Sequence, residues 1–401
     1  MRTGALTGAT QDVVRRHNLA AVLSQVHLRG RTSRAELTAR LGLNRSTIGA
    51  LTADLVGAGL VVETTPAVPA RSAGRPSLVV APRDDVYVLA VHLGVEGLVV
   101  ARVALGGRVL DRVSSRHAAG RTDPGSILPR IGAALTELAD PTGRGGRCVG
   151  VAVAVCGVVR QSDGMVRIAP NLGWTDVPLG RVLPETAGLG LPVSVGNEAD
   201  LGVLAEHLRG AAVGVDDVIF VFGEVGLGGG VLAGGRPVAG HGGYAGEVGH
   251  LMVNPAGRRC RCGKVGCWET EAGIDALVGA AAADRAHAVR ELLAAARAGS
   301  EPAMATVGGF ARWLAVGLGQ LVTVFNPEMV ILGGMLADVF DEVARDVHRE
   351  LPAAALRPSA EQVRLVVPAL GRDSALLGAA ELAFAPLLAD PLGVMGAAAP
   401  P

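Results

Sequence analysis

The first 60 residues contain three stretches in which apolar side chains recur at the spacing of one helix face. The first runs from Asp12 to Leu28 and the second from about Ser33 to Arg40. Glu36 stands three residues after Ser33, which is the order of a capping box and predicts where the second helix begins. The apolar residues of the first stretch are Leu19, Val22, Leu23 and Val26.

The third stretch follows a short turn at Gly42 and Leu43. Asn44 stands at its start, where a side-chain oxygen can accept from the free amides of the first turn. We expect its apolar residues to face inward and its polar amino end to face outward. The inward residues are Ile48, Leu51 and Leu55, and the outward ones are Arg45, Ser46, Thr47 and Ala50. This order predicts a helix-turn-helix with a recognition helix; a plain three-helix packing module is the alternative.

Two short strands are expected after the third helix, at Leu60–Thr64 and Ser77–Val80, with a Pro/Ala-rich loop between them. Such a hairpin would be a wing, and Arg71 and Arg75 would lie in its loop, where an arginine can enter a narrow minor groove. A flexible linker with incidental charge is the alternative. The candidate DNA contacts are therefore Arg34, Asn44, Arg45, Ser46, Thr47, Arg71 and Arg75.

Beyond Arg83 the pattern changes to apolar strands alternating with helices. Helices are expected at Asn197–Arg209 and around Ala303–Val324. Buried strands are expected at Val86–Val91, Leu98–Val103, Val149–Val155, Val193–Gly196, Val218–Phe222 and Val330–Gly333. This α/β organisation over about 300 residues predicts two lobes with a ligand cleft between them.

Composition and charge limit the size, partners and location of the protein. A chain of 401 residues with 49% hydrophobic content can bury a large core and hold two or three domains. Residues 1–83 carry a formal charge of +7, and residues 84–401 therefore carry −7, which suggests a polyanionic partner for the amino-terminal part. We find no signal peptide and no uninterrupted apolar run of membrane-spanning length, so we expect a cytoplasmic protein without membrane insertion.

Three of the five cysteines lie within eight positions, at Cys260, Cys262 and Cys267, shortly after His250. Four such donors complete the tetrahedron of a structural zinc ion and leave no open position for water. Cysteines spaced this closely in a reducing compartment are typical of metal ligands. Small buried thiols or a disulfide are the alternatives.

The body also contains a set of short polar and glycine-rich segments in a characteristic order. They are Ala90–Gly94, Asn197–Asp200, the glycine loop Gly226–Gly230, Gly246–His250, and Asn326–Glu328 before Leu332–Gly334. Together they resemble the ROK family (repressors, open reading frames and sugar kinases) along the whole body. With the winged helix in front, the chain resembles the ROK transcriptional regulators of the xylose or N-acetylglucosamine repressor type.

The resemblance implies an α/β fold in which a winged helix-turn-helix precedes a two-lobed, actin-like ATPase (ribonuclease H-like) body. We expect the DNA-binding domain and its wing or linker at 1–82, and the first lobe at 83–200, completed by about 372–390. The second lobe, with the zinc site, is expected at 201–371. The small, proline-ended stretch 391–401 is expected to be a mobile tail.

The resemblance also implies a sugar or sugar-phosphate effector in the cleft. Carboxylates and amides suit paired sugar hydroxyls, and one nitrogen of His250 can bind zinc while the other meets the sugar. For Glu247 a solvated loop carboxylate is the alternative, and for Glu269 a surface or supporting role. The sugar-contact positions carried over are Gly157, Asn197, Glu198, Glu247, His250 and Glu269.

Several residues depart from the pattern of ROK sugar kinases. His92 and Glu96 occupy places where those kinases have Asp and Thr, and Glu198 occupies the place of the catalytic Asp. Glu224 and Val225 stand at the mouth of the glycine segment, where they would disfavour nucleotide phosphates. We therefore expect no ATP and no catalytic residue. The favoured function is a sugar-responsive repressor that binds operator DNA as a homodimer or homotetramer; the alternative is a sugar kinase with an appended DNA-binding domain.

Overall fold

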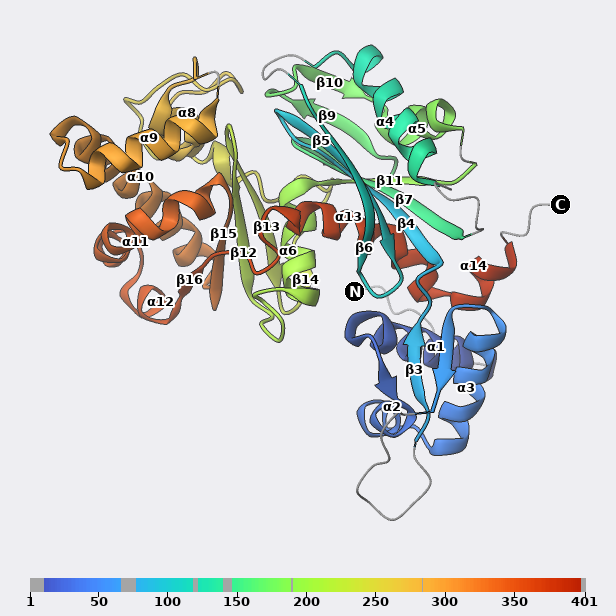
Figure 1. Ribbon diagram of the computed structural model, residues 1–401. Helices are drawn as coiled ribbons and strands as arrows, with labels where there is room; N and C mark the ends of the chain where they lie inside the picture. Colours follow the sequence, from blue (N-terminus) through green and yellow to red (C-terminus); the bar gives the residue numbers. More distant parts are fainter. Residues whose placement is uncertain are drawn as a thin grey trace.

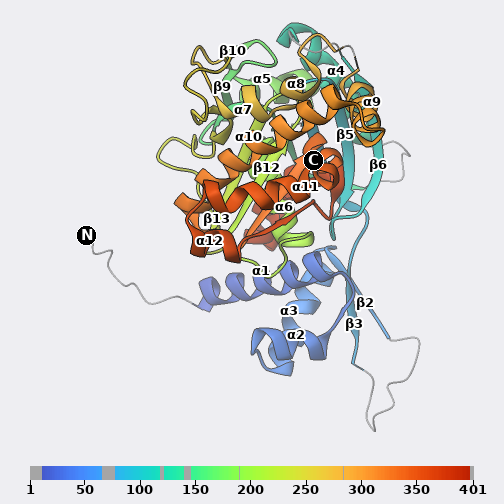
Figure 2. The ribbon, with the colours of Figure 1, turned by 90° about the vertical axis from the view of Figure 1, so that its left-hand side faces the viewer.

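The computed structural model describes residues 11–65, 77–117, 122–139, 146–188, 190–282 and 284–397. Figure 1 shows a small amino-terminal domain in blue, a lobe above it that holds β4 to β7 and β11, and a second lobe that holds β12 to β16. In Figure 2 the first helix runs along the underside of the body. The three parts match the order predicted from the sequence.

The amino-terminal domain contains the predicted helix-turn-helix and its strand pair. Ser33 and Glu36 form the capping box, Gly42 ends the second helix with a φ of 65°, and the Asn44 side chain accepts from the amide of Thr47 at the third helix. Its elements are α1 (Gln11–Arg29), β1 (Thr32–Ser33), α2 (Arg34–Leu41), α3 (Arg45–Gly57), β2 (Val61–Thr64) and β3 (Val79–Pro82). β3 lies between β1 and β2 and pairs antiparallel with both. Arg71 and Arg75 lie outside the described residues.

The first lobe is built on a five-stranded sheet in the order β11-β7-β4-β5-β6. Alternate residues of its central strand β4 pack on opposite faces: Val88 faces α6 and α13, and Leu89 faces α4 and α5. The strands are β4 (Val86–Leu93), β5 (Gly97–Ala104), β6 (Val109–Arg116), β7 (Arg147–Val155) and β11 (Val193–Asn197). The helices are α4 (Pro124–Ala139), α5 (Leu179–Ala187), α6 (Glu198–Arg209) and α13 (Ser374–Ala389). A small sheet of β8 (Val158–Arg160), β9 (Met165–Ala169) and β10 (Trp174–Val177) follows β7.

The second lobe has a sheet in the order β14-β13-β12-β15-β16. Its strands are β12 (Val218–Gly223), β13 (Leu227–Ala233), β14 (Arg236–Pro237), β15 (Met329–Gly334) and β16 (Arg364–Val366). Its helices are η1 (Val248–His250), α7 (Trp268–Ala272), α8 (Ile274–Val278), α9 (Arg285–Arg297), α10 (Glu301–Phe325), α11 (Met335–Ala354) and α12 (Arg357–Gln362), and η2 (Gly371–Asp373) leads into α13. By length and composition α10 could cross a membrane, but it buries Phe310, Leu314 and Leu318 in the core of this lobe.

Three sequence predictions about these elements are wrong. The predicted glycine loop is mostly strand, because all of its residues except Gly226 belong to β13. A Cβ at Gly230 would overlap the carbonyl oxygen of Ala199, so the glycines of this strand serve close packing. The expected lobe boundary at residue 200 falls inside α6, which packs against both sheets.

The expected mobile tail is also wrong for residues 391–397, which form helix α14 (Pro391–Ala397). Val394 and Met395 pack against the core of the first lobe and the DNA-binding domain, and Arg147 Nη2 donates to the carbonyl oxygen of Met395 at 2.6 Å. A short apolar stretch that is adjacent to an existing core gains burial by docking as a helix, which composition alone does not reveal.

Candidate ligand cleft and metal centre

Six residues predicted to contact a sugar line one cavity of about 170 Å³ between the lobes. They are Gly157, Asn197, Glu198, Glu247, His250 and Glu269. Gly157 and Asn197 come directly from the carboxyl ends of the parallel strands β7 and β11, which meet at one edge of the sheet. The other side of the cavity comes from the second lobe. Their role as sugar contacts stays a prediction, but one concave site holds them all.

Asn197 is held in place by both ends of its amide. The side-chain oxygen accepts from the amides of Ala199 and Asp200 and so caps α6, while Nδ2 donates to the carbonyl oxygen of Gly157 at 2.9 Å. Gly157 has a φ of 131°, and a Cβ there would come within 2.7 Å of the Ala169 Cβ. The carbonyl of Gly157 therefore approaches Asn197 only because this residue is glycine.

His92 and Glu198 form a pair at one end of the cavity. His92 Nε2 lies 2.9 Å from Glu198 Oε2, and both side chains are largely buried. Burial opposes charge on the imidazole, but the hydrogen bond and charge of Glu198, with the nearby Glu224, raise the pKa of His92. Burial and the charge of Glu198 raise the pKa of Glu224 to about 7. This end of the cleft therefore combines an imidazole with two carboxyl groups.

Acidic groups also line the opposite wall. Burial, with repulsion from Glu269, raises the pKa of Glu247, although His250 partly opposes the shift. Behind it, burial and the charge of Glu247 raise the pKa of Asp200 to about 7. Carboxylates at this density suit a ligand rich in hydroxyl donors.

The four candidate metal ligands come together as the sequence predicts. The ligand atoms of His250, Cys260, Cys262 and Cys267 all lie within 4.8 Å of one another. The Cys262 and Cys267 sulfurs are 3.7 Å apart, and the Cys260 sulfur is 3.7 Å from His250 Nδ1. Tetrahedral bonds of about 2.3 Å from zinc place two sulfurs roughly 3.8 Å apart. The residues therefore fit zinc.

The chain around the cluster folds through tight turns. Cys267 bridges to Met252, and Gly266 has a φ of 73°, at a point where a Cβ would overlap the carbonyl oxygen of Asn254. His250 presents Nδ1 to the cysteines and also lines the cavity, so its other nitrogen is the one available to a ligand. The Cys260 thiol donates to Glu269 Oε1 at 2.8 Å. A metal-bound thiolate carries no proton, so metal binding would release this carboxylate oxygen for the cleft.

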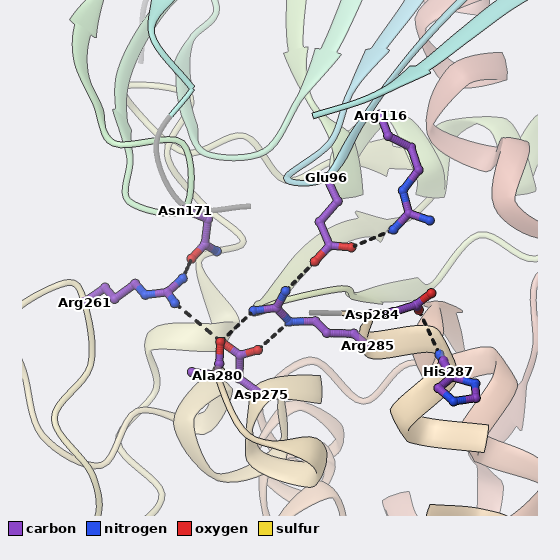
Figure 3. A network of polar contacts seen from close by, with 9 residues as sticks. All are labelled: Glu96, Arg116, Asn171, Arg261, Asp275, Ala280, Asp284, Arg285 and His287. Carbon is purple, nitrogen blue, oxygen red and sulfur yellow. Dashed lines mark hydrogen bonds and ion pairs between the residues drawn. The ribbon is translucent and has the colours of Figure 1, made fainter. Parts of the chain in front are cut away.

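Arg285 connects the two lobes, as Figure 3 shows. Its guanidinium, with a side chain only 4% exposed, contacts Glu96 from the β4–β5 turn and donates from Nε to Asp275 at 2.6 Å. Arg116 lies on the other side of Glu96, and Arg261 spans from Asp275 to Asn171 of the first lobe. Glu96, at the place where ROK sugar kinases have Thr, is thus paired with a guanidinium from the facing lobe.

Several cavity residues were missed in the sequence. Asn171, Phe222 and Cys156 line it, and none of them is among the predicted site residues. The run Pro170-Asn171-Leu172-Gly173 places one polar residue between apolar ones directly after a strand, which is a usable signal for Asn171. Nothing local distinguishes Phe222 from an ordinary core residue.

The candidate DNA contacts divide into two groups. Arg45 and Ser46 are exposed at the start of α3, and Thr47 is half-buried beside them. Asn44 caps α3, and its Oδ1 accepts from the Ser46 hydroxyl at 2.7 Å. Arg34 pairs with both carboxylate oxygens of Glu63, at 2.6 and 2.5 Å, and so ties α2 to β2. Arg34 and Asn44 therefore have structural partners inside the domain, whereas Arg45 is presented outward.

Comparison with known proteins agrees with this architecture. Residues 88–385 match the ROK family. A putative xylose repressor from Caldicellulosiruptor sp. is 29% identical over 377 residues, covering 90% of this chain and 93% of that protein. A glucokinase from Streptomyces coelicolor is 34% identical over 295 residues, covering 68% of this chain and 89% of that enzyme. A solved ROK family transcriptional regulator, described as a homolog of the E. coli MLC protein, has a TM-score of 0.77 at 25% identity, covering 96% and 99% of the two chains. Since the matched segment spans both lobes and the cleft between them, this chain belongs to the ROK family.

Proposed function

We propose that this protein is a DNA-binding transcriptional regulator, acting as a repressor, whose affinity for operator DNA depends on a sugar or sugar phosphate in the cleft. The observation that carries the proposal is the packing of a winged helix, with Arg45 outward on α3, against a body whose cleft gathers five polar sugar-contact candidates and the Gly157 backbone. The likeness to xylose repressors over both parts of the chain supports it.

The sugar is held by Asn197, Glu198, Glu247, His250 and Glu269, with the Gly157 backbone close by. Each of these can accept or donate the paired hydrogen bonds that adjacent hydroxyls require, and an epimer that left one of them buried without a partner would bind less well. Zinc on His250 and the three cysteines is structural in this proposal. It fixes two cleft residues, His250 and Glu269, on one wall.

On DNA, a homodimer or homotetramer places two α3 helices in successive major grooves of a pseudo-palindromic operator. Arg45, Ser46 and Thr47 lie near base edges and phosphates, and wing arginines Arg71 and Arg75 reach the minor groove. The protein acts in the cytoplasm, where both DNA and sugar are available, and it neither inserts into a membrane nor requires ATP.

The second candidate function is a sugar kinase with an appended DNA-binding domain. The likeness to a Streptomyces glucokinase favours it, and Glu198 supplies a carboxylate in the cleft. Against it stands the imidazole of His92 where family kinases carry a carboxylate. An imidazole does not supply the oxygen ligand that Mg²⁺ prefers, and this one is already hydrogen-bonded to Glu198.

One experiment separates the two functions. Thermal shift of the full-length protein with D-xylose, D-glucose, N-acetyl-D-glucosamine and their phosphates identifies a ligand. A DNA fragment selected by the protein from a random-sequence pool then serves as operator. If the protein is a regulator, the ligand should change the operator Kd without ADP formation. ADP formation that depends on the sugar supports the kinase instead.

A further inference from the structure

A buried polar trio joins the DNA-binding domain to the body. His27 comes from the end of α1, Arg209 from the last position of α6, and Glu381 from α13. His27 Nε2 lies 3.0 Å from Glu381 Oε2, and Arg209 Nε lies 2.5 Å from Glu381 Oε1. The three side chains are 0%, 12% and 4% exposed in the order His27, Arg209, Glu381. A charged network this deeply buried costs desolvation and is sensitive to small displacements.

Both ring nitrogens of His27 have polar partners. The Gly106 amide donates to His27 Nδ1 at 3.0 Å, and His27 Nε2 lies 3.0 Å from Glu381 Oε2 and 2.6 Å from Arg209 Nη2. Arg209 donates to the backbone carbonyl oxygens of Gly106 at 3.1 Å and His27 at 3.2 Å. Gly107 has a φ of 85°, and a Cβ there would lie 2.6 Å from the Arg209 Cζ, so this turn is shaped around the guanidinium.

The other end of the same helix lies in the cleft. Asn197 caps α6, and Glu198, its first residue, lines the cavity and pairs with His92. Twelve residues at 1.5 Å each separate the two ends by about 18 Å. A single helix thus begins among the candidate sugar contacts and ends on the DNA-binding domain.

Close packing leaves α6 no freedom to bend between these ends. A Cβ at Gly202 would lie 2.6 Å from the ring of Phe220, and a Cβ at Gly378 of α13 would overlap the carbonyl oxygen of Leu201. Glu206, fully buried, accepts from the amides of Ala369 and Leu370 and from the Ser374 hydroxyl. These contacts lock α6 and α13 closely together, so a shift of one helix would carry the other with it.

We propose that α6 transmits sugar occupancy to the DNA-binding domain, with Arg209 as the positioning residue that couples it to His27. The inference rests on the proposed function. A sugar bonded to Asn197 and Glu198 favours one position of α6, and the directional bonds of Arg209 translate that position into the tilt of α1. Neither Arg209 nor His27 lines the cavity, and neither lies on α3.

The test compares wild type with Arg209→Lys and Arg209→Met. Lysine keeps the positive charge beside Glu381 but cannot reproduce the guanidinium hydrogen bonds to both carbonyl oxygens. If the methionine variant does not fold, the lysine variant still tests the proposal. Arg290→Met, at an exposed position of α9, is the matched control. The operator is the selected fragment, and the sugar is whichever of D-xylose, D-glucose or N-acetyl-D-glucosamine shifts the melting temperature.

In wild type and in Arg290→Met, the sugar should change the operator Kd by about 5- to 150-fold, the usual range of coupling between two sites. In both Arg209 variants that ratio should fall to within about twofold, although sugar Kd and operator Kd measured separately stay within about threefold of wild type. His27→Gln should give the same loss, and combining it with Arg209→Lys should add nothing further, because both changes break one contact.

Hydrogen exchange distinguishes coupling through Arg209 from a role of Arg209 in stability alone, because only coupling makes exchange in α1 depend on the sugar. Sugar should alter amide exchange at 197–203 in every variant, but at 11–29 only in wild type and the control. A full sugar response of operator Kd in folded Arg209→Lys overturns the coupling inference alone. If no sugar alters operator binding of the wild type, the proposed function fails, and this inference fails with it.

Discussion

The imidazole of His92 lies 2.9 Å from the carboxylate of Glu198 at the end of the cleft, in a chain whose family includes sugar kinases. The two residues are 106 positions apart and come from β4 and from the first position of α6. The imidazole engages one oxygen of the Glu198 carboxylate, so that oxygen is not free to take a proton from a ligand hydroxyl as a general base would.

We therefore expect no ADP formation above background when the protein is mixed with Mg-ATP and each sugar that binds it. Glu198→Gln should leave this background unchanged, and it should weaken sugar binding by about tenfold because a hydrogen bond to a charged group is replaced by a neutral one. A coupled assay for ADP measures the first and calorimetry the second. Sugar-dependent turnover in wild type that disappears in Glu198→Gln would restore the kinase interpretation.

Glu247→Ala should abolish the sugar response and leave operator binding intact. The side chain lines the cavity, and loss of a charged hydrogen-bond partner costs about 1.5–3 kcal/mol, or roughly 10- to 150-fold in sugar Kd. Glu361→Ala, an exposed acid on α12, is the control. Calorimetry gives the sugar Kd and fluorescence anisotropy the operator Kd. A sugar response equal to that of wild type would remove Glu247 from the site.

Cys262→Ser should lose bound zinc and lower the melting temperature. Its sulfur is one of four donors that converge in the cluster, and a hydroxyl is a poor replacement for a thiolate. Because the cluster positions His250 and Glu269, sugar binding should weaken as well. Cys148→Ser, remote from the cluster, should retain zinc. Elemental analysis measures the metal content; a zinc-to-protein ratio unchanged in Cys262→Ser would contradict the assignment.

Arg45→Ala should weaken operator binding by about 1–3 kcal/mol, which corresponds to roughly 5- to 150-fold in Kd. The side chain is exposed at the amino end of α3, where it can reach a phosphate or a base edge. Arg290→Ala should have no effect. Gel shifts at two salt concentrations test this, because a lost phosphate contact also lowers the salt dependence. If wild type and Arg45→Ala bound the operator with equal affinity, DNA would contact another part of the domain.

Asp200→Asn should stabilise the protein at alkaline pH. The folded protein keeps the Asp200 proton up to a pKa of about 7, whereas the unfolded chain loses it near 3.8. Between these values the folded state binds more protons, so the free energy of unfolding falls as pH rises and the loss is complete above pH 7. Asparagine removes this dependence.

The gain should therefore be roughly 2–4 kcal/mol at pH 8 and should shrink toward pH 5. Melting temperatures of wild type and Asp200→Asn across this range measure it. Asp217→Asn, on an exposed loop before β12, is the control and should show no pH-dependent difference. If the melting temperatures of wild type and Asp200→Asn differed by the same amount at every pH, the buried-charge explanation would be wrong.

Much of the fold was predictable because its signals are local. The helices of the DNA-binding domain follow from apolar spacing and from caps such as Ser33 and Asn44, whose hydrogen bonds reach only three residues along the chain. The buried strands follow from continuous apolar runs. The four metal-ligand candidates span only 18 positions, so residue type and spacing were enough to group them.

Other features depend on which distant segments meet. His27 and Glu381 are 354 positions apart, and either one in isolation resembles an ordinary surface residue. The glycines of β13 suggest a loop until α6 is packed against them, and α14 suggests a loose tail until the adjacent core is known. The sequence by itself therefore determined the helices of the DNA-binding domain, the main buried strands, the set of metal-ligand candidates and the family. Only the tertiary structure decided the His92–Glu198 pair, the interlobe bridge at Arg285 and the junction at Arg209. Each joins groups far apart in the sequence, and the desolvation cost of burying them is offset only once folding brings them within hydrogen-bond distance.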